Sequence, residues 1–402
     1  MENLPLSLVL ISSIIKILII VHMLLIGVMG MIWAERRVSA WIQDRYGPNR
    51  VGPQGLLQPI ADGIKFLLKE DLIPEHVDKV VYILAPAIIL IPALITCAVV
   101  PFGSEIPVSW DGQEYRIPLQ IADIDIGILY ILAITSLGVY GVVLGAWASN
   151  NKYSFLGGLR ASAQMVSYEL PLGLSIVGVL MLSESLRLRE IVLAQSSFLH
   201  WNFLTHFPSF LVFIIAVFAE TNRLPFDLAE AEQELVGGYH TEYSSMKFAM
   251  YFMAEYMHMI VGSVVVVVLF LGGWYFPGLE KLVDSGTLVG GLLSFIIVFV
   301  KTAFFLFFFI WVRWSLPRFR YDQLMNLGWK VLLPIALTSI VVTAVVWVVS
   351  ESRLWVGIFN VISAVVVTSV VTTLVSMRSK SKVVIEDDLD IVSGDSPSFM
   401  TR

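Results

Sequence analysis

Nine long apolar runs constrain this chain more than any other feature of its sequence. A helix needs about 20 apolar residues to cross roughly 30 Å of membrane hydrocarbon. Only 14% of the residues are charged, which is too few to cover the surface of a soluble domain. The runs are continuous and do not alternate, so they exclude a β-barrel. The sequence predicts an all-α polytopic membrane protein with about nine transmembrane helices, near residues 6–34, 82–100, 126–148, 164–183, 203–220, 248–271, 288–312, 330–350 and 354–377.

The lysines and arginines are distributed unevenly between the two sides that these helices define. The segments after odd-numbered helices, together with the C-terminal tail, hold 19 of them, and the opposite side holds 5. Basic residues concentrate in cytoplasmic loops, so the N-terminus is expected outside and the C-terminus in the cytoplasm. Residues 386–402 are polar and are expected to form a disordered tail.

One cytoplasmic loop departs from this basic character. Residues 219–243 contain six acidic residues and a single basic residue, Arg223; the acids are Glu220, Asp227, Glu230, Glu232, Glu234 and Glu242. The spacing of Asp227, Glu230 and Glu234 places them on one helix face, where crowding disfavours simultaneous ionisation. A solvated acidic helix end is the simpler alternative to a functional site.

Several charged residues also lie within the predicted crossings. The uncharged core of the fourth crossing has only 13 residues, so its helix must extend back through Glu169. Glu255 and His258 lie in the sixth crossing and Lys301 lies in the seventh. A lone charge at such depth costs a few kcal/mol, so each is expected to have a partner. The two interpretations are a static ion pair and a proton relay.

The connection 34–79 contains a predicted surface helix. Its apolar positions, among them Ile60, Ile64 and Phe66, follow a helical period, with Asp62 mostly opposite. Such a helix can cover an apolar cavity that opens to lipid, or it can be a simple interfacial anchor.

The chain has no evident redox site of its own. It contains one cysteine, Cys97, which excludes a four-thiolate iron–sulfur site built from this chain alone. No dinucleotide-binding or P-loop motif is present, and two helical histidines, His22 and His258, are weak grounds for haem ligation. No flavin, iron–sulfur cluster, haem or metal is expected in this chain, and no nucleic-acid partner.

Three stretches, in this order, resemble one protein family. They are YGPNRVGPQGLLQPIADGIKFLLKED, AETNRLPFDLAEAEQELVGGYHTEY and PRFRYDQLMNLGWK. The chain resembles the membrane component of respiratory complex I known as the H subunit of NADH–quinone oxidoreductase or as NADH dehydrogenase subunit 1. The resemblance implies that residues 1–353 form an eight-helix domain, that 354–385 add a C-terminal helix and its flank, and that 386–402 are a tail. It also implies a bacterial inner membrane rather than a mitochondrial one.

The resemblance further implies roles for individual residues. The protein would help to form a quinone tunnel, quinone being the substrate, and would couple quinone reduction to proton pumping. The residues implied near quinone are Glu35, Arg36, Asp62, Phe66, Arg223, Phe226 and Asp227. The residues implied in the proton path are Glu169, Glu220, Glu230, Glu232, Glu234, Glu242, Glu255 and Lys301. The implied partners are iron–sulfur and quinone-site subunits of the peripheral arm, and antiporter-like membrane subunits.

Two alternatives remain open from the sequence. One is a homologous ion-pumping module of a membrane-bound hydrogenase, in which a quinone cavity would be vestigial. The other is a stand-alone secondary transporter that uses the same intramembrane acids, although paired broken helices in two halves are not evident.

Overall fold

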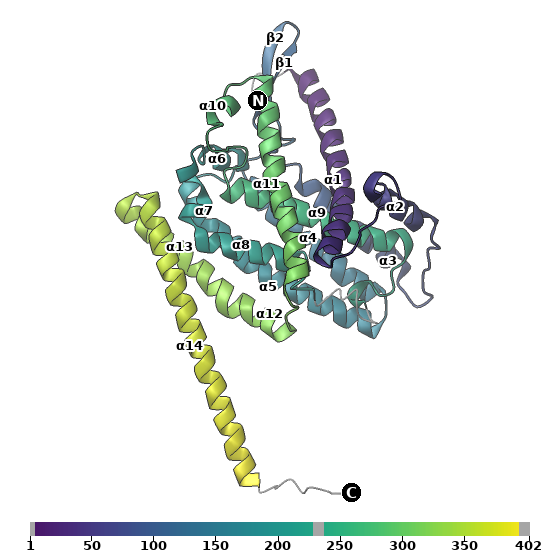
Figure 1. The fold of residues 1–402 in the computed structure, drawn as a ribbon, viewed down its shortest axis with the longest axis vertical. Helices are drawn as coiled ribbons and strands as arrows, with labels where there is room; N and C mark the ends of the chain where they lie inside the picture. Colours follow the sequence, from purple (N-terminus) through teal and green to yellow (C-terminus); the bar gives the residue numbers. More distant parts are fainter. Residues whose placement is uncertain (1–4, 228–236, 394–402) are drawn as a thin grey trace.

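The structure is a computed structural model that describes residues 5–227 and 237–393, with side chains described as far as residue 373. Within these ranges eight helices are long and apolar enough to cross a membrane, which confirms an all-α polytopic membrane protein (Figure 1). They are α1 (Leu6–Ile42), α3 (Lys79–Thr96), α4 (Gly127–Ala148), α5 (Lys152–Ser183), α9 (Ser245–Phe270), α11 (Leu288–Ser315), α13 (Leu333–Ser350, continuous with α12 and η4) and α14 (Arg353–Ser393).

Shorter elements connect these helices. They are η1 (Pro53–Gly55), α2 (Gln58–Leu68), α6 (Leu188–Leu193), η2 (Phe198–His200), α7 (Asn202–Thr205), α8 (Phe207–Glu220), η3 (Gly238–His240), α10 (Glu280–Val283), α12 (Tyr321–Leu327) and the π-helical turn η4 (Gly328–Leu332). An antiparallel hairpin, β1 (Glu105–Trp110) and β2 (Gln113–Pro118), was not predicted from the sequence. Its turn at Asp111–Gly112 has positive φ at both residues, as a tight hairpin turn requires.

The predicted fifth crossing, 203–220, is wrong in its extent. The chain leaves helical geometry at His206 (φ −122°, ψ 45°), and α8 starts afresh with Pro208 in its first turn, where proline is favoured. With 14 residues α8 is about 21 Å long, shorter than the hydrocarbon core. Its C-terminal residues Ala216 and Ala219 are fully buried, so the loop that follows Glu220 starts inside the helical bundle.

The fourth predicted crossing extends back through Glu169, as expected from its short uncharged core. Helix α5 begins at Lys152 and has 32 residues, so it extends well before the predicted start at 164 and carries Glu169 near its middle. The Asn151 side chain caps the helix by accepting a hydrogen bond of 2.9 Å from the backbone N–H of Tyr153.

Helix α9 forms the centre of the bundle. Its C-terminal half is a run of buried valines from Val264 to Val268, and it packs against α1, α3, α8 and α11. Most of its side chains are buried within the protein, so this mostly apolar helix lies among other helices rather than against lipid. Polar side chains on α9 are therefore enclosed by protein.

Helix α14 packs beside α13 at its start and then extends away from the bundle (Figure 1). The Asn360 amide joins it to the bundle: its oxygen accepts from Ser339 at 2.9 Å, and its nitrogen donates to Thr343 at 3.1 Å. The helix continues to Ser393, past the predicted boundary at 386. Residues 380–391 contain neither glycine nor proline, so nothing in them interrupts the helix. The division into domains remains a prediction.

Candidate functional site

A cavity of about 750 Å³ lies between α1, α2 and α9. Its walls are mainly apolar, with Ile32 from α1, Ile60 and Phe66 from α2, and Phe252 and Met253 from α9. The volume is within the range of sites that enclose a small organic ligand. Helix α2 places Ile60, Ile64 and Leu67 on this cavity, as expected for a helix that covers an apolar site.

Four residues predicted near quinone line the cavity: Glu35, Arg36, Asp62 and Phe66. Arg36 and Asp62 form an ion pair of 2.6 Å between the end of α1 and α2. The amide of Gln58 donates a hydrogen bond of 3.2 Å to the other Asp62 oxygen. Since the Arg36 side chain is 46% exposed, the pair is worth little energy, but it fixes α2 against α1 at the cavity rim.

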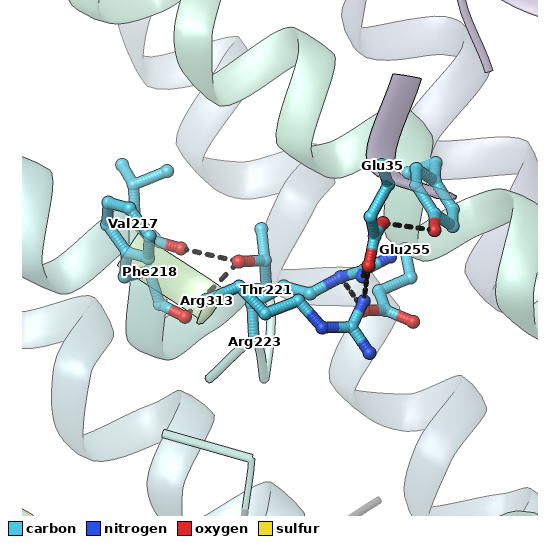
Figure 2. A network of polar contacts seen from close by, with 8 residues as sticks. Glu35, Val217, Phe218, Thr221, Arg223, Glu255 and Arg313 are labelled. Atoms are coloured by element: carbon cyan, nitrogen blue, oxygen red, sulfur yellow. Dashed lines mark hydrogen bonds and ion pairs between the residues drawn. The ribbon is translucent and has the colours of Figure 1, made fainter. Parts of the chain in front are cut away.

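A charge cluster, which we define as Glu35, Arg223, Glu255, Tyr256 and Arg313, adjoins the cavity, and three of its members, Glu35, Tyr256 and Arg313, line it. Figure 2 shows how its four charged side chains lie. Arg223 approaches Glu35 at 3.3 Å and forms an ion pair with Glu255. Arg313 forms a second ion pair with Glu35. The Tyr256 hydroxyl donates a hydrogen bond of 2.6 Å to Glu35, and its ring lies 4.2 Å from the Arg223 guanidinium carbon.

The cluster is buried and balanced in charge. Its four ionisable side chains are 5% to 16% exposed, and it contains two carboxylates and two guanidinium groups. Buried charges are tolerated only when they are paired, and removing one partner leaves the other uncompensated. The members come from α1, α9, α11 and the loop after α8, so the cluster exists only when these elements are assembled.

The other predicted quinone residues have different positions. The Phe226 ring is buried between Tyr168 and Phe319, at 5.7 Å and 5.6 Å, and does not line the cavity. The amide of Gln164 lies within hydrogen-bond distance of the Ala219 and Phe226 carbonyls and so holds the loop. Asp227 is the last described residue before the gap at 228–236.

The predicted proton-path residues are only partly brought together. Glu220 at the end of α8 is close enough to Glu169 of α5 for their charges to interact. Glu242 accepts a hydrogen bond of 2.5 Å from the Asn151 amide. Glu230, Glu232 and Glu234 lie outside the described residues.

Lys301, on α11, lies beside the C-terminal end of α9. Its ammonium donates to the carbonyls of Leu271, Gly273 and Tyr275 at 2.6 to 2.9 Å and lies over the Trp201 ring. Glu255 and Leu271 are about 24 Å apart along the helix. Lys301 therefore does not pair with Glu255. A role of Lys301 in the proton path remains a prediction.

Sequence reasoning missed two members of the charge cluster. In the sequence Arg313 indicates only orientation, as one of the 19 basic residues on the cytoplasmic side, and Tyr256 indicates no role. Neither residue carries a local signal. Adjacent residues on a helix do not face each other, so the position of Tyr256 directly after Glu255 predicts no bond between them. Their shared partner Glu35 is 221 residues from Tyr256 and 278 residues from Arg313 in the chain.

Comparison with known proteins gives consistent matches over most of the chain. Residues 15–344 match the family described as NADH dehydrogenase. The chain is 50% identical over 314 residues to the H subunit of NADH-quinone oxidoreductase of Flavobacterium psychrophilum, covering 78% of this chain and 90% of that protein. It is 51% identical over 354 residues to H subunit 2 of the same enzyme of Koribacter versatilis, covering 84% and 97%. It is 48% identical over 334 residues to NADH-quinone oxidoreductase subunit 8 of Rhodothermus marinus, covering 81% and 94%.

Proposed function

The chain belongs to the family of H subunits of NADH-quinone oxidoreductase, and we propose that it forms part of a quinone tunnel and couples quinone reduction to proton translocation. It is a subunit of a multi-subunit membrane enzyme and has the helices of a multi-pass membrane protein.

The observation that carries the proposal is the apolar cavity lined in part by the charge cluster. A quinone has an apolar tail and a planar headgroup with two carbonyl acceptors. The apolar side chains of α1, α2 and α9 suit the tail. Arg36 and Arg313 at the cavity wall can donate to headgroup carbonyls.

The charge cluster supplies a physical route for coupling. Reduction of a quinone requires protons and creates transient negative charge. Added negative charge beside Arg313 competes with Glu35 for that guanidinium, and Glu35 also shares Arg223 with Glu255. A change at the cavity would therefore alter the protonation of Glu255 through two shared cations. From Glu255 the proposed path continues through Glu220 and Glu169.

The same proposal includes the membrane in which the chain lies, its orientation and its partner subunits. The chain would lie in the bacterial inner membrane, with its N-terminus outside and its C-terminus cytoplasmic. Iron–sulfur subunits of a peripheral arm would supply electrons, and antiporter-like membrane subunits would receive the coupling. The open cavity favours a quinone function over a hydrogenase module with a vestigial site.

Gly63 allows a direct test of the cavity. It lines the cavity from α2, and a Cβ added there would meet open space, so a large side chain can enter without moving the backbone. In the assembled enzyme Gly63→Trp is expected to abolish quinone reduction while NADH oxidation by a water-soluble artificial acceptor continues. Gly63→Ala is the matched control and should retain quinone reduction. Normal quinone reduction by Gly63→Trp would refute the tunnel assignment.

A further inference from the structure

Two small cavities lie between the charge cluster and the acids further along the proposed path. One, of about 20 Å³, is lined by Glu255, Glu220 and His258. The other, of about 30 Å³, is lined by Glu220 and His258 and extends between α4, α5, α8 and α9. A space of this size accommodates one water molecule when two to four polar groups surround it.

His258 is common to both cavities. It lies three residues after Glu255, so the two side chains share a face of α9. Its Nε2 is buried and has no hydrogen-bond partner among the described residues. The backbone of Ile89 accepts a hydrogen bond from the ring, which holds the imidazole in place. Gly138 of α4 lies beside the ring, since a Cβ added there would be 3.6 Å from Nε2.

The remaining polar groups of the two cavities suit water molecules. Thr135 and Thr221 line both cavities. The Thr135 hydroxyl donates to the Ile131 carbonyl at 3.0 Å, and the Thr221 hydroxyl donates to the Val217 carbonyl at 3.1 Å (Figure 2). Because their protons are committed to carbonyls, both oxygens are free to accept from water. Tyr239 and Tyr251 also face the smaller cavity.

We propose that His258 and one water molecule in each cavity transfer protons between Glu255 and Glu220. A protonated Glu255 gives its proton to the first water, which passes a proton to Nε2 of the neutral imidazole. The imidazolium then releases the Nε2 proton through the second water to the Glu220 carboxylate. Glu255 becomes a carboxylate, Glu220 becomes a carboxylic acid, and His258 returns to its neutral form. This inference rests on the proposed coupling function and adds a residue to it.

The test uses the whole enzyme reconstituted in vesicles, with proton uptake and quinone reduction measured together. His258→Leu and His258→Gln should each lower NADH-driven proton uptake at least about tenfold, since a positioned proton-transfer group contributes about 10²–10⁴-fold. His206→Leu is the matched control, because His206 is also buried without a ring hydrogen-bond partner among the described residues but lines neither cavity.

The glutamine variant separates a proton-transfer role from a packing role. Glutamine retains a polar group of similar size but does not titrate, so parent-level pumping by His258→Gln would overturn the inference. Slow pumping by both His258 variants with normal pumping by His206→Leu supports it. A density map of the parent enzyme that resolves water and shows none within hydrogen-bond distance of Nε2 would also overturn it.

The same experiment separates this inference from the function on which it rests. If Glu255→Gln and Glu220→Gln stop pumping while both His258 variants pump normally, the acid path stands and the role of His258 is wrong. If all four variants pump at the parent rate, the coupling function itself is wrong.

Discussion

The Tyr256 hydroxyl donates a hydrogen bond of 2.6 Å to the carboxylate of Glu35, joining the two helices that form the cavity walls. The same carboxylate is bound by Arg223 and Arg313. Glu35 is therefore the point where the cavity and the buried charges meet, and its surroundings provide the most direct tests.

Tyr256→Phe removes this hydrogen bond but keeps the ring beside Arg223. A hydrogen bond to a charged group contributes about 1.5–3 kcal/mol, so the variant is expected to lower both the melting temperature of the enzyme and its rate of quinone reduction. Tyr251→Phe, on the same helix as Tyr256, is the control, because it removes a hydrogen bond of 3.2 Å to the neutral carbonyl of Gly141 on α4. Equal effects of the two variants in thermal melting and quinone kinetics would contradict the prediction.

Glu35→Gln and Asp62→Asn should differ in stability. The first leaves two buried guanidinium groups without their shared charge, and breaking a buried pair costs about 3–5 kcal/mol. The second breaks a half-exposed pair worth about 0–1 kcal/mol. Thermal melting of the purified enzyme measures both, and comparable losses would show that Glu35 is not held as described.

Arg36→Ala and Asp62→Ala should each weaken quinone access without preventing assembly. Both residues lie at the cavity rim, and their ion pair holds α2 in position. The Michaelis constant for quinone is expected to rise severalfold, and the sensitivity to quinone-site inhibitors to change. Leu68→Ala, on α2 but outside the cavity, is the control. Unchanged kinetics in both rim variants would mean that the tunnel mouth lies elsewhere.

Glu169→Gln and Glu255→Gln should impair proton pumping in the assembled enzyme. Both carboxylates lie within long helices, and a glutamine at either position cannot carry a proton. We expect proton uptake and coupled quinone reduction to fall at least about tenfold. The exposed Glu184→Gln serves as control. If both variants pump protons at the parent rate, Glu169 and Glu255 are not part of the proton path.

His240, in η3 within the acidic loop, predicts a pH dependence of stability. Burial lowers its pKa to about 4, from about 6.5 in an unfolded chain. The unfolded state therefore binds more protons between these values, so stability rises with pH in this window and is lost as pH falls from about 6.5 to 4. The loss is at most about 3 kcal/mol.

His240→Phe should reduce this acid sensitivity, since phenylalanine does not titrate and the position already contacts Phe248 and Tyr239. Thermal melting from pH 4 to 7 measures the effect, with the exposed His76→Phe for comparison. Identical pH profiles for His240→Phe and the parent would contradict the lowered pKa of His240.

The sequence predicted the helices well because their cause is local. A run of apolar residues near 20 in number specifies a membrane helix without reference to the rest of the chain. The same reasoning placed Glu169 within a long helix, because 13 uncharged residues are too few to cross. It failed at residues 203–220, where a break at His206 shortens α8 in a run that is otherwise apolar.

The charge cluster could not be assembled from the sequence. Arg223 and Arg313 lie 188 and 278 residues after Glu35, and no local pattern pairs them with it. Composition shows only that buried charges need partners, not which partners they find.

The sequence by itself determined that this chain spans a membrane, which residues carry charge into its helices, and which family its motifs resemble. The tertiary structure alone decided that Glu35 binds two arginines, that α2 covers a cavity of about 750 Å³, and that His258 faces two water-sized spaces. The two kinds of feature differ in how far along the chain their causes reach. The transfer of apolar residues into the membrane acts on each helix separately. The pairing of buried charges and the shape of cavities depend on how helices distant in sequence pack together.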